Sequence, residues 1–185
     1  MELVGWTNDR LVADRIQRLP EDQWVYGVAN ASIVMAAFLH VAPGGMRFNG
    51  PDLGAWYAAD DLRTAAAEVG HHLRREALAR GVATMARTYR SYSANLIGDY
   101  LDIRGEERMR HDVYDGTSYA ASQVLGEEVR SSGGAGILYD SVRLKGGAAI
   151  VAHRPRNIQG VVQADHFEIT VFAIDRRIDV RKLAA

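Results

Sequence analysis

One helical stripe between residues 60 and 80 constrains the fold of this chain more than any other feature. Asp60 can cap a helix that runs to about Arg80, because apolar residues recur at helical spacing at Leu62, Ala66, Val69, Leu73 and Ala77. The next segment, 83–95, alternates polar residues with threonine and tyrosine, which predicts a half-exposed strand. Shorter strands are predicted at 54–58, 136–139, 148–152 and 167–174.

Two further helices complete the predicted pattern. One covers residues 8–19, with Thr7 or Asn8 as its N-cap, and the other runs from Thr117 or Ser118 to the glycines near 133. Too few helices alternate with strands for a doubly wound parallel sheet, so the sequence predicts a mixed α/β (α+β) fold. The segment 176–182 mixes charges of both signs and is interpreted as a solvated edge.

The longest apolar run, residues 31–42, is short of the roughly 20 residues that a membrane-spanning helix needs. We interpret 33–41 as a buried strand, although its periodicity also fits a buried helix. The 185 residues contain no linker-like segment, so we expect a single domain over 1–185. The first 19 residues are too charged for a signal peptide, and the chain has no cysteine, so we expect a cytoplasmic protein without a membrane anchor.

The charge balance excludes one class of function. With 22 Lys and Arg against 23 Asp and Glu, the net charge is −1, which does not suit a protein held on nucleic acid by phosphate contacts. Phosphate-loop, dinucleotide-glycine, zinc-helix and nucleophile-elbow motifs are missing. His111, Asp112 and Asp115 do not make a complete ligand set, so no metal is expected.

Three short motifs occur in order along the chain. Gly45-Met-Arg-Phe-Asn-Gly50, followed by Trp56-Tyr57-Ala58, places Arg47 between two turns. Ala65-Ala-Ala-Glu68 lies on the predicted helix, and Gly136-Ile-Leu-Tyr-Asp-Ser-Val-Arg143 carries Ser141 at the end of a strand. Over about residues 31–157, these motifs resemble the RES domain, named for its arginine, glutamate and serine. Those letters fall on Arg47, Glu68 and Ser141.

The resemblance implies a fold similar to the ADP-ribosyltransferases and the role of toxin in a type II toxin–antitoxin system. It implies an enzyme that depletes NAD, its substrate, by cleaving the nicotinamide–ribose bond through hydrolysis or phosphorolysis. It also implies homodimers and neutralisation by a cognate Xre-type helix-turn-helix antitoxin. DNA contacts would then belong to the antitoxin, in agreement with the net charge of this chain.

The residue types suit this chemistry. Cleavage of the glycosidic bond builds positive charge on the ribose, which a carboxylate such as Glu68 stabilises. The guanidinium of Arg47 matches the oxygens of a diphosphate. Tyr57 offers a ring face for a base and a hydroxyl at its edge, and Ser141 can fix a ribose hydroxyl or the carboxamide, or serve only its own turn.

Other interpretations remain open at this stage. The same donor site suits a protein ADP-ribosyltransferase, and a catalytically silent NAD-binding or interaction protein keeps the same fold. His72, one helical turn after Glu68, can orient that carboxylate or form a surface pair with it. Because Arg47 and Glu68 lie outside the apolar stripe, we expect alanine at either position to abolish toxicity and to leave the fold intact.

Overall fold

The computed structural model describes residues 9–184, and within them the chain forms two β-sheets and four α-helices. The helices are α1 (Asp9–Ile16), α2 (Ala31–Leu39), α3 (Leu62–Ala79) and α4 (Ala120–Ser131). The strands are β1 (Trp56–Ala59), β2 (Thr84–Leu96), β3 (Tyr100–Asp102), β4 (Gly136–Asp140), β5 (Ala148–Ala152), β6 (Ile158–Phe172) and β7 (Asp175–Lys182). These elements confirm the predicted mixed α/β class.

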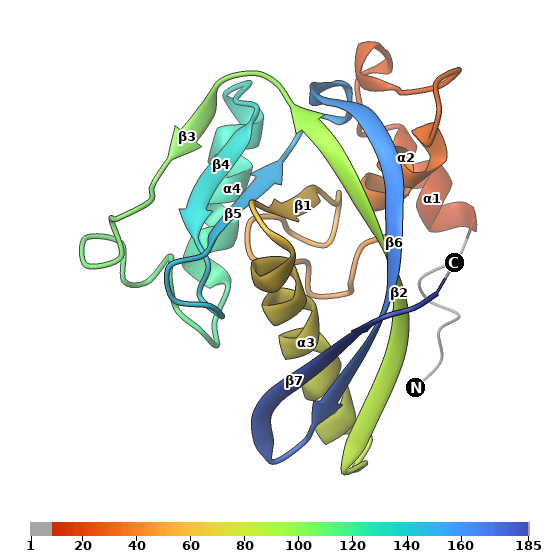
Figure 1. Cartoon of the computed structure of the whole chain (residues 1–185). Helices are drawn as coiled ribbons and strands as arrows, with labels where there is room; N and C mark the ends of the chain where they lie inside the picture. The colour runs from red at the N-terminus through yellow and green to blue at the C-terminus, as the bar shows by residue number, and fades with distance from the viewer. Residues whose placement is uncertain (1–8, 185) are drawn as a thin grey trace.

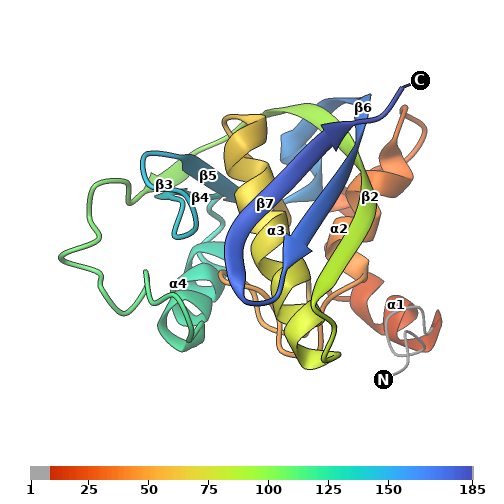
Figure 2. The ribbon, with the colours of Figure 1, turned by 60° about the horizontal axis from the view of Figure 1, so that its bottom comes forward.

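The two sheets lie on either side of α3 (Figure 1). The first has the strand order β1-β5-β4-β3, in which only the β3–β4 pair is parallel among the described strands. The second has the order β2-β6-β7 and is antiparallel throughout. Figure 2 shows β7 passing across α3, so the second sheet curls around the helix.

The first turn of α3 is fixed by a side-chain cap. Asp61 is the N-cap, and its carboxylate accepts hydrogen bonds from the backbone N–H of Thr64 (2.7 Å) and from the Thr64 hydroxyl (3.0 Å). The cap is therefore one residue later than predicted. Asp60 instead accepts a bond from the backbone N–H of Ala148 (3.3 Å), which ties the start of the helix to β5.

The apolar stripe of α3 faces the second sheet, as its spacing predicts. Its buried residues form a cluster with two residues of β6, and the members are Ala66, Leu73, Ile169 and Val171. Gly70 lies on the same side of the helix, where a Cβ atom would stand 2.6 Å from Ile178 Cδ1 of β7. The absence of a side chain at Gly70 lets β7 approach the helix closely.

A second core lies between α4 and the first sheet. Leu125 and Val129 of α4 pack against a buried cluster that consists of Phe48, Ala55, Ile103, Val113, Tyr114, Ile137, Tyr139, Ala149 and Val151. Gly126 allows the closest approach, because a Cβ atom there would lie 2.0 Å from the carbonyl oxygen of Phe48. The segment that carries Arg47 is therefore seated directly on α4.

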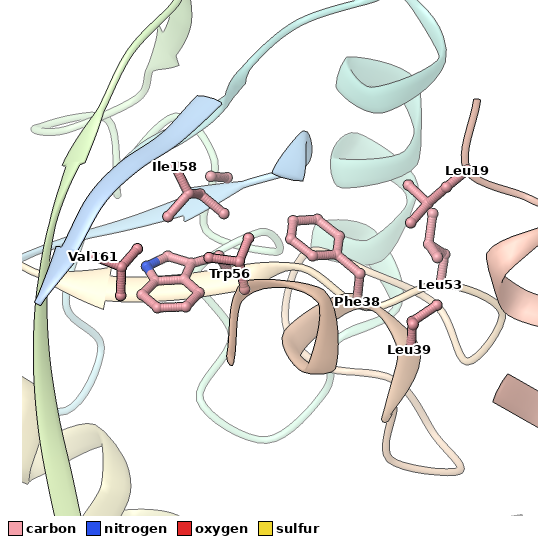
Figure 3. Close-up of a cluster of buried hydrophobic side chains, with 9 residues drawn as sticks. Leu19, Phe38, Leu39, Leu53, Trp56, Ile158 and Val161 are labelled. Atoms are coloured by element: carbon pink, nitrogen blue, oxygen red, sulfur yellow. The ribbon is translucent and has the colours of Figure 1, made fainter. Parts of the chain in front are cut away.

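The expectation of a strand at 33–41 is wrong, because this segment forms helix α2. Val34 and Phe38, one helical turn apart, are both fully buried against Trp56 of β1 and the start of β6, as Figure 3 shows for Phe38 and Trp56. Ile33 and Met35 are partly buried on other sides of the helix. The segment is apolar all around, so its residue pattern contains no period that separates a helix from a strand.

Several predicted boundaries shift. The strand expected at 167–174 is the second half of β6, which begins at Ile158. The run 176–182, interpreted as a solvated edge, belongs to an exposed edge strand, β7. The short strand β3 was not among the predicted strands. The predicted N-cap of the first helix lies outside the described residues. No helix within residues 9–184 is both long and apolar enough to cross a bilayer.

Candidate active site

Three of the four predicted site residues line one pocket, and the fourth binds one of them. Arg47 lies in the loop before β1, Tyr57 on β1 and Glu68 on α3, and all three face a cavity of about 190 Å³. Ser141 follows β4 directly and is not part of the lining. The fold thus brings together residues that are up to 94 positions apart in the sequence (141 − 47).

Ser141 and Glu68 are joined by a short hydrogen bond. The Ser141 hydroxyl donates to Glu68 Oε1 at 2.6 Å. The same oxygen accepts bonds of 3.1 Å from the backbone N–H groups of Arg143 and Leu144, which fixes the turn after β4. Since those bonds occupy the oxygen's lone pairs, its proton is directed to the carboxylate. Ser141 therefore positions Glu68, and all hydrogen bonds of the Ser141 hydroxyl are made within the protein.

Arg47 is buried, with 7% of its surface exposed. Its Nη1 donates to the carbonyl oxygens of Val113 (3.0 Å) and Asp115 (2.9 Å), and its guanidinium carbon lies 4.8 Å from the centre of the Tyr119 ring. These contacts bind the long loop before α4 to the pocket. The expectation that alanine at this position leaves the fold intact assumed an unburied side chain. Because Arg47 is buried and supports the loop, we instead expect its removal to lower stability.

The other terminal nitrogen of Arg47 has a different environment. Nη2 is buried and has no hydrogen-bond partner among the described residues. Burial lowers the pKa of the guanidinium from its usual value, but an arginine stays charged at neutral pH. A buried cationic donor without a partner beside a pocket is suited to an anionic ligand group.

Helix α4 holds the turn that presents Arg47. Gln123 donates from its amide nitrogen to the carbonyl oxygens of Gly44 (2.8 Å) and Met46 (3.0 Å), and Glu127 Oε1 accepts from the backbone N–H of Gly50 (2.9 Å). A backbone bond of 2.9 Å from Met46 N–H to the Asn49 carbonyl closes the turn. The rigid placement expected from the flanking proline and glycine residues is thus reinforced from outside the turn.

Tyr57 uses its hydroxyl within the protein. The oxygen accepts a hydrogen bond from the backbone N–H of Phe48 (2.9 Å) and donates one to Asn49 Oδ1 (2.8 Å). Burial raises the pKa of the phenol, so it stays protonated. Only its ring is available to a ligand, which corrects the expectation of a free hydroxyl at the ring edge.

The rest of the pocket wall is largely apolar, with one histidine. The lining consists of Met46, Arg47, Tyr57, Ala58, Ala59, Ala65, Glu68, Val69, His72, Tyr119 and Tyr139. Burial, and then the positive charges of Arg75, Arg143 and Arg47, lower the pKa of His72 to about 4. The imidazole is therefore neutral at physiological pH.

Sequence reasoning did not single out Tyr119 or Tyr139 as site residues. Both lie inside segments of the predicted pattern: Tyr139 shares a strand face with position 141 by the period of two, and Tyr119 precedes the last helix. The strand period of two could therefore have identified Tyr139 as a candidate site residue. The described residues contain no group of three or more metal-ligating side chains arranged around one point.

A concave, mostly apolar pocket with a few convergent polar groups is the usual form of a small-molecule site. The fold and this pocket together define a mixed α/β domain with a cavity of a form suited to a small ligand. Residues 16–171 match the RES domain, and the chain belongs to that family. The matched segment contains Arg47, Glu68 and Ser141 and extends beyond the 31–157 predicted from the motifs.

The fold is also similar to a solved structure. A chain of the M. tuberculosis MbcT-MbcA toxin–antitoxin complex superimposes with a TM-score of 0.50 and 19% sequence identity, over 66% of this chain and 73% of that chain. At this level of identity the likeness concerns the fold. A comparison with curated proteins found no match.

Proposed function

We propose that this chain is the toxin of a toxin–antitoxin pair and that it depletes NAD by cleaving the nicotinamide–ribose bond, through hydrolysis or phosphorolysis. The observation that carries the proposal is the Glu68 carboxylate, held at 2.6 Å by Ser141 in the wall of an apolar pocket. Membership of the RES domain family and the fold similarity to a chain of a toxin–antitoxin complex support the biological role.

The chemistry depends on where positive charge develops. As the bond to nicotinamide breaks, the ribose becomes an oxocarbenium-like cation, and a nearby carboxylate stabilises this state more than the ground state. The walls formed by Ala58, Ala65 and Val69 are apolar, and the attraction between charges is stronger in apolar surroundings. Because Ser141 fixes the carboxylate before the substrate arrives, little reorganisation accompanies the reaction.

Arg47 has two roles in this proposal. Nη1 supports the loop at Val113 and Asp115, and Nη2 is the donor for a substrate phosphate oxygen. The cavity of about 190 Å³ is smaller than the roughly 300–1,000 Å³ of sites that enclose a whole drug-sized ligand. We therefore assign it to the nicotinamide riboside half of NAD, with the adenosine half extending outside.

The partner in this proposal is an antitoxin of the Xre helix-turn-helix type, and the toxin forms homodimers within the complex. The similarity to a chain from a toxin–antitoxin complex supports a protein partner. A partner that covers the pocket would block substrate entry without any change in the chain. Contacts to DNA belong to the partner, because the net charge of this chain is −1.

The test is incubation of the purified, antitoxin-free protein with NAD, with and without inorganic phosphate, followed by mass spectrometry. ADP-ribose indicates hydrolysis, and ADP-ribose 1″-phosphate formed only with phosphate indicates phosphorolysis. Glu68→Gln keeps an acceptor for Ser141 but loses the charge, so turnover should fall by roughly 100- to 1,000-fold. The matched control is Glu76→Gln, on the same helix but paired with Arg80 and Arg87 away from the pocket.

Two outcomes contradict the proposal. If NAD is stable with this chain alone and is consumed, with release of nicotinamide, only as an added protein gains ADP-ribose, the chain is a protein ADP-ribosyltransferase that uses the same donor site. If NAD binds and no product of either kind forms, the chain is a catalytically silent binding protein.

A further inference from the structure

His72 occupies a place in the pocket that the proposed reaction does not yet use. It lies one helical turn after Glu68, on the side of α3 that also presents Ala65 and Val69 to the cavity. The imidazole makes no hydrogen bond with any described residue, and its ring neighbour is His71, with centroids 5.4 Å apart. A polar side chain thus faces the cavity with its hydrogen-bonding groups free.

The charges around His72 explain its protonation state. Arg47, Arg75 and Arg143 all disfavour a positive charge on the imidazole, as does burial, and the pKa falls to about 4. A neutral imidazole presents one N–H donor and one nitrogen acceptor. It also avoids repelling the positively charged pyridinium ring of bound NAD, which an imidazolium would do.

The helical rise between the two residues is comparable to the length of the substrate's ring. Four residues of helix separate Glu68 and His72 by about 6 Å along the axis. This is close to the span of a nicotinamide ring between its glycosidic nitrogen and its carboxamide. A carboxylate at the ribose therefore places the imidazole near the far end of the ring.

Much of the wall beside these two residues offers no partner to a carboxamide. Ala58, Ala65 and Val69 offer no polar side-chain atoms, and the hydroxyl of Tyr57 is already bonded to Phe48 and Asn49. A primary amide buried there without a partner would bind more weakly, because its lost hydrogen bonds to water are not replaced. His72 can supply the missing partner.

We propose that His72 determines leaving-group specificity by hydrogen bonding to the carboxamide of the nicotinamide ring. The assignment rests on the proposed cleavage of NAD and adds the group that distinguishes nicotinamide from other pyridines. The expected contribution is a preference of roughly 10- to 100-fold for NAD over an analogue that lacks the amide.

The experiment compares NAD with its 3-acetylpyridine analogue, in which a methyl ketone keeps the carbonyl but lacks the amide N–H. It therefore tests the bond that the amide N–H donates to the unprotonated nitrogen of His72. Wild-type protein should prefer NAD in kcat/KM, and His72→Ala should lower the NAD value while bringing the ratio close to 1. His72→Gln, which retains a donor and an acceptor, should restore part of the preference. His71→Ala is the matched control, since His71 is adjacent on α3 but outside the lining, and should keep the wild-type ratio.

A binding measurement separates failure of this inference from failure of the proposed function. Calorimetry with free nicotinamide and free 3-acetylpyridine requires no turnover, and the wild-type preference for nicotinamide should disappear in His72→Ala. An unchanged preference in that variant overturns the inference, even if NAD is cleaved. If NAD is not cleaved at all, the proposed function fails, and this binding comparison still decides the role of His72.

Discussion

The Ser141 hydroxyl donates a hydrogen bond of 2.6 Å to Glu68 Oε1, although the two residues belong to different layers of the fold. Glu68 lies on the helix between the sheets, and Ser141 closes a turn at the end of β4. In the proposed reaction the serine therefore acts through the carboxylate and is a positioning residue. Its absence from the cavity lining agrees with that role.

Ser141→Ala should lower kcat for NAD cleavage by roughly 10- to 100-fold, because the freed carboxylate must be reoriented in each turnover. KM should change less, since the serine does not line the pocket. Steady-state kinetics measures this split. Ser118→Ala, which removes another hydroxyl that caps a turn at the backbone N–H of Ala120, is the control and should leave both constants unchanged. A rise in KM alone would assign Ser141 to substrate binding.

Arg47→Ala should reduce the free energy of unfolding by roughly 2–4 kcal/mol, because two buried hydrogen bonds from a charged donor to Val113 and Asp115 are lost. Denaturant unfolding measures the change, and limited proteolysis should cleave the loop 103–119 sooner. Arg63→Ala, on the exposed side of α3, should stay within about 0.5 kcal/mol of wild type. Equal stability of the Arg47 and Arg63 variants contradicts the supporting role assigned to Arg47.

The packing of the turn that carries Arg47 against α4 can be tested with substitutions of glycine residues. Gly126→Ala places a Cβ atom 2.0 Å from the Phe48 carbonyl oxygen, and a backbone atom cannot rotate away. We expect a loss of about 3 kcal/mol from overpacking, together with lower activity because Phe48 adjoins Arg47. Gly44→Ala has no neighbouring atom within 4 Å of the added carbon and should be neutral in thermal unfolding. Similar melting temperatures for the two variants contradict this packing.

Site residues were predictable where a sequence motif coincides with a helical or strand period. They were not predictable where long-range contacts determine the position of a side chain. The helical period put Glu68 and His72 on one flank of the stripe, and both line the pocket. The partners of Arg47 were not predictable, because Val113 and Asp115 lie 66 and 68 residues away and offer backbone carbonyls, which every residue type has. The sequence therefore contains no signal that Arg47 is buried.

The elements of the fold were likewise predictable only where their residues show a clear period. Helix α3 and strand β2 have clear periods and were predicted within two residues at each end, whereas α2 is apolar on all sides and was taken for a strand. Strand β7 was not predicted as a strand, because it is mostly exposed and carries charges on both faces. Its pairing with β6 and the contact of Ile178 with the core cluster were not visible in the sequence.

The last prediction concerns acid stability and His153, which follows β5. The side chain is 2% exposed, and neither ring nitrogen has a hydrogen-bond partner among the described residues. Burial, and then the charges of Arg130 and Arg154, lower its pKa to about 3. Between pH 3 and about 6.5 the unfolded chain therefore binds a proton at this position that the folded chain does not bind. The free energy of unfolding is highest above pH 6.5 and decreases as the pH falls through this window.

His153→Leu should remove this share of the pH dependence. At pH 5 the wild-type protein should lose roughly 2 kcal/mol through His153 relative to pH 7.5, and the leucine variant should lose that much less. Urea unfolding at the two pH values measures the difference. His71 and His72, whose pKa values are each lowered to about 4, keep some acid sensitivity in the variant. His111 is exposed, so His111→Leu is the control, and its free energy of unfolding should depend on pH as in the wild type. If His153→Leu and His111→Leu show the same pH dependence, His153 is not buried as a neutral group.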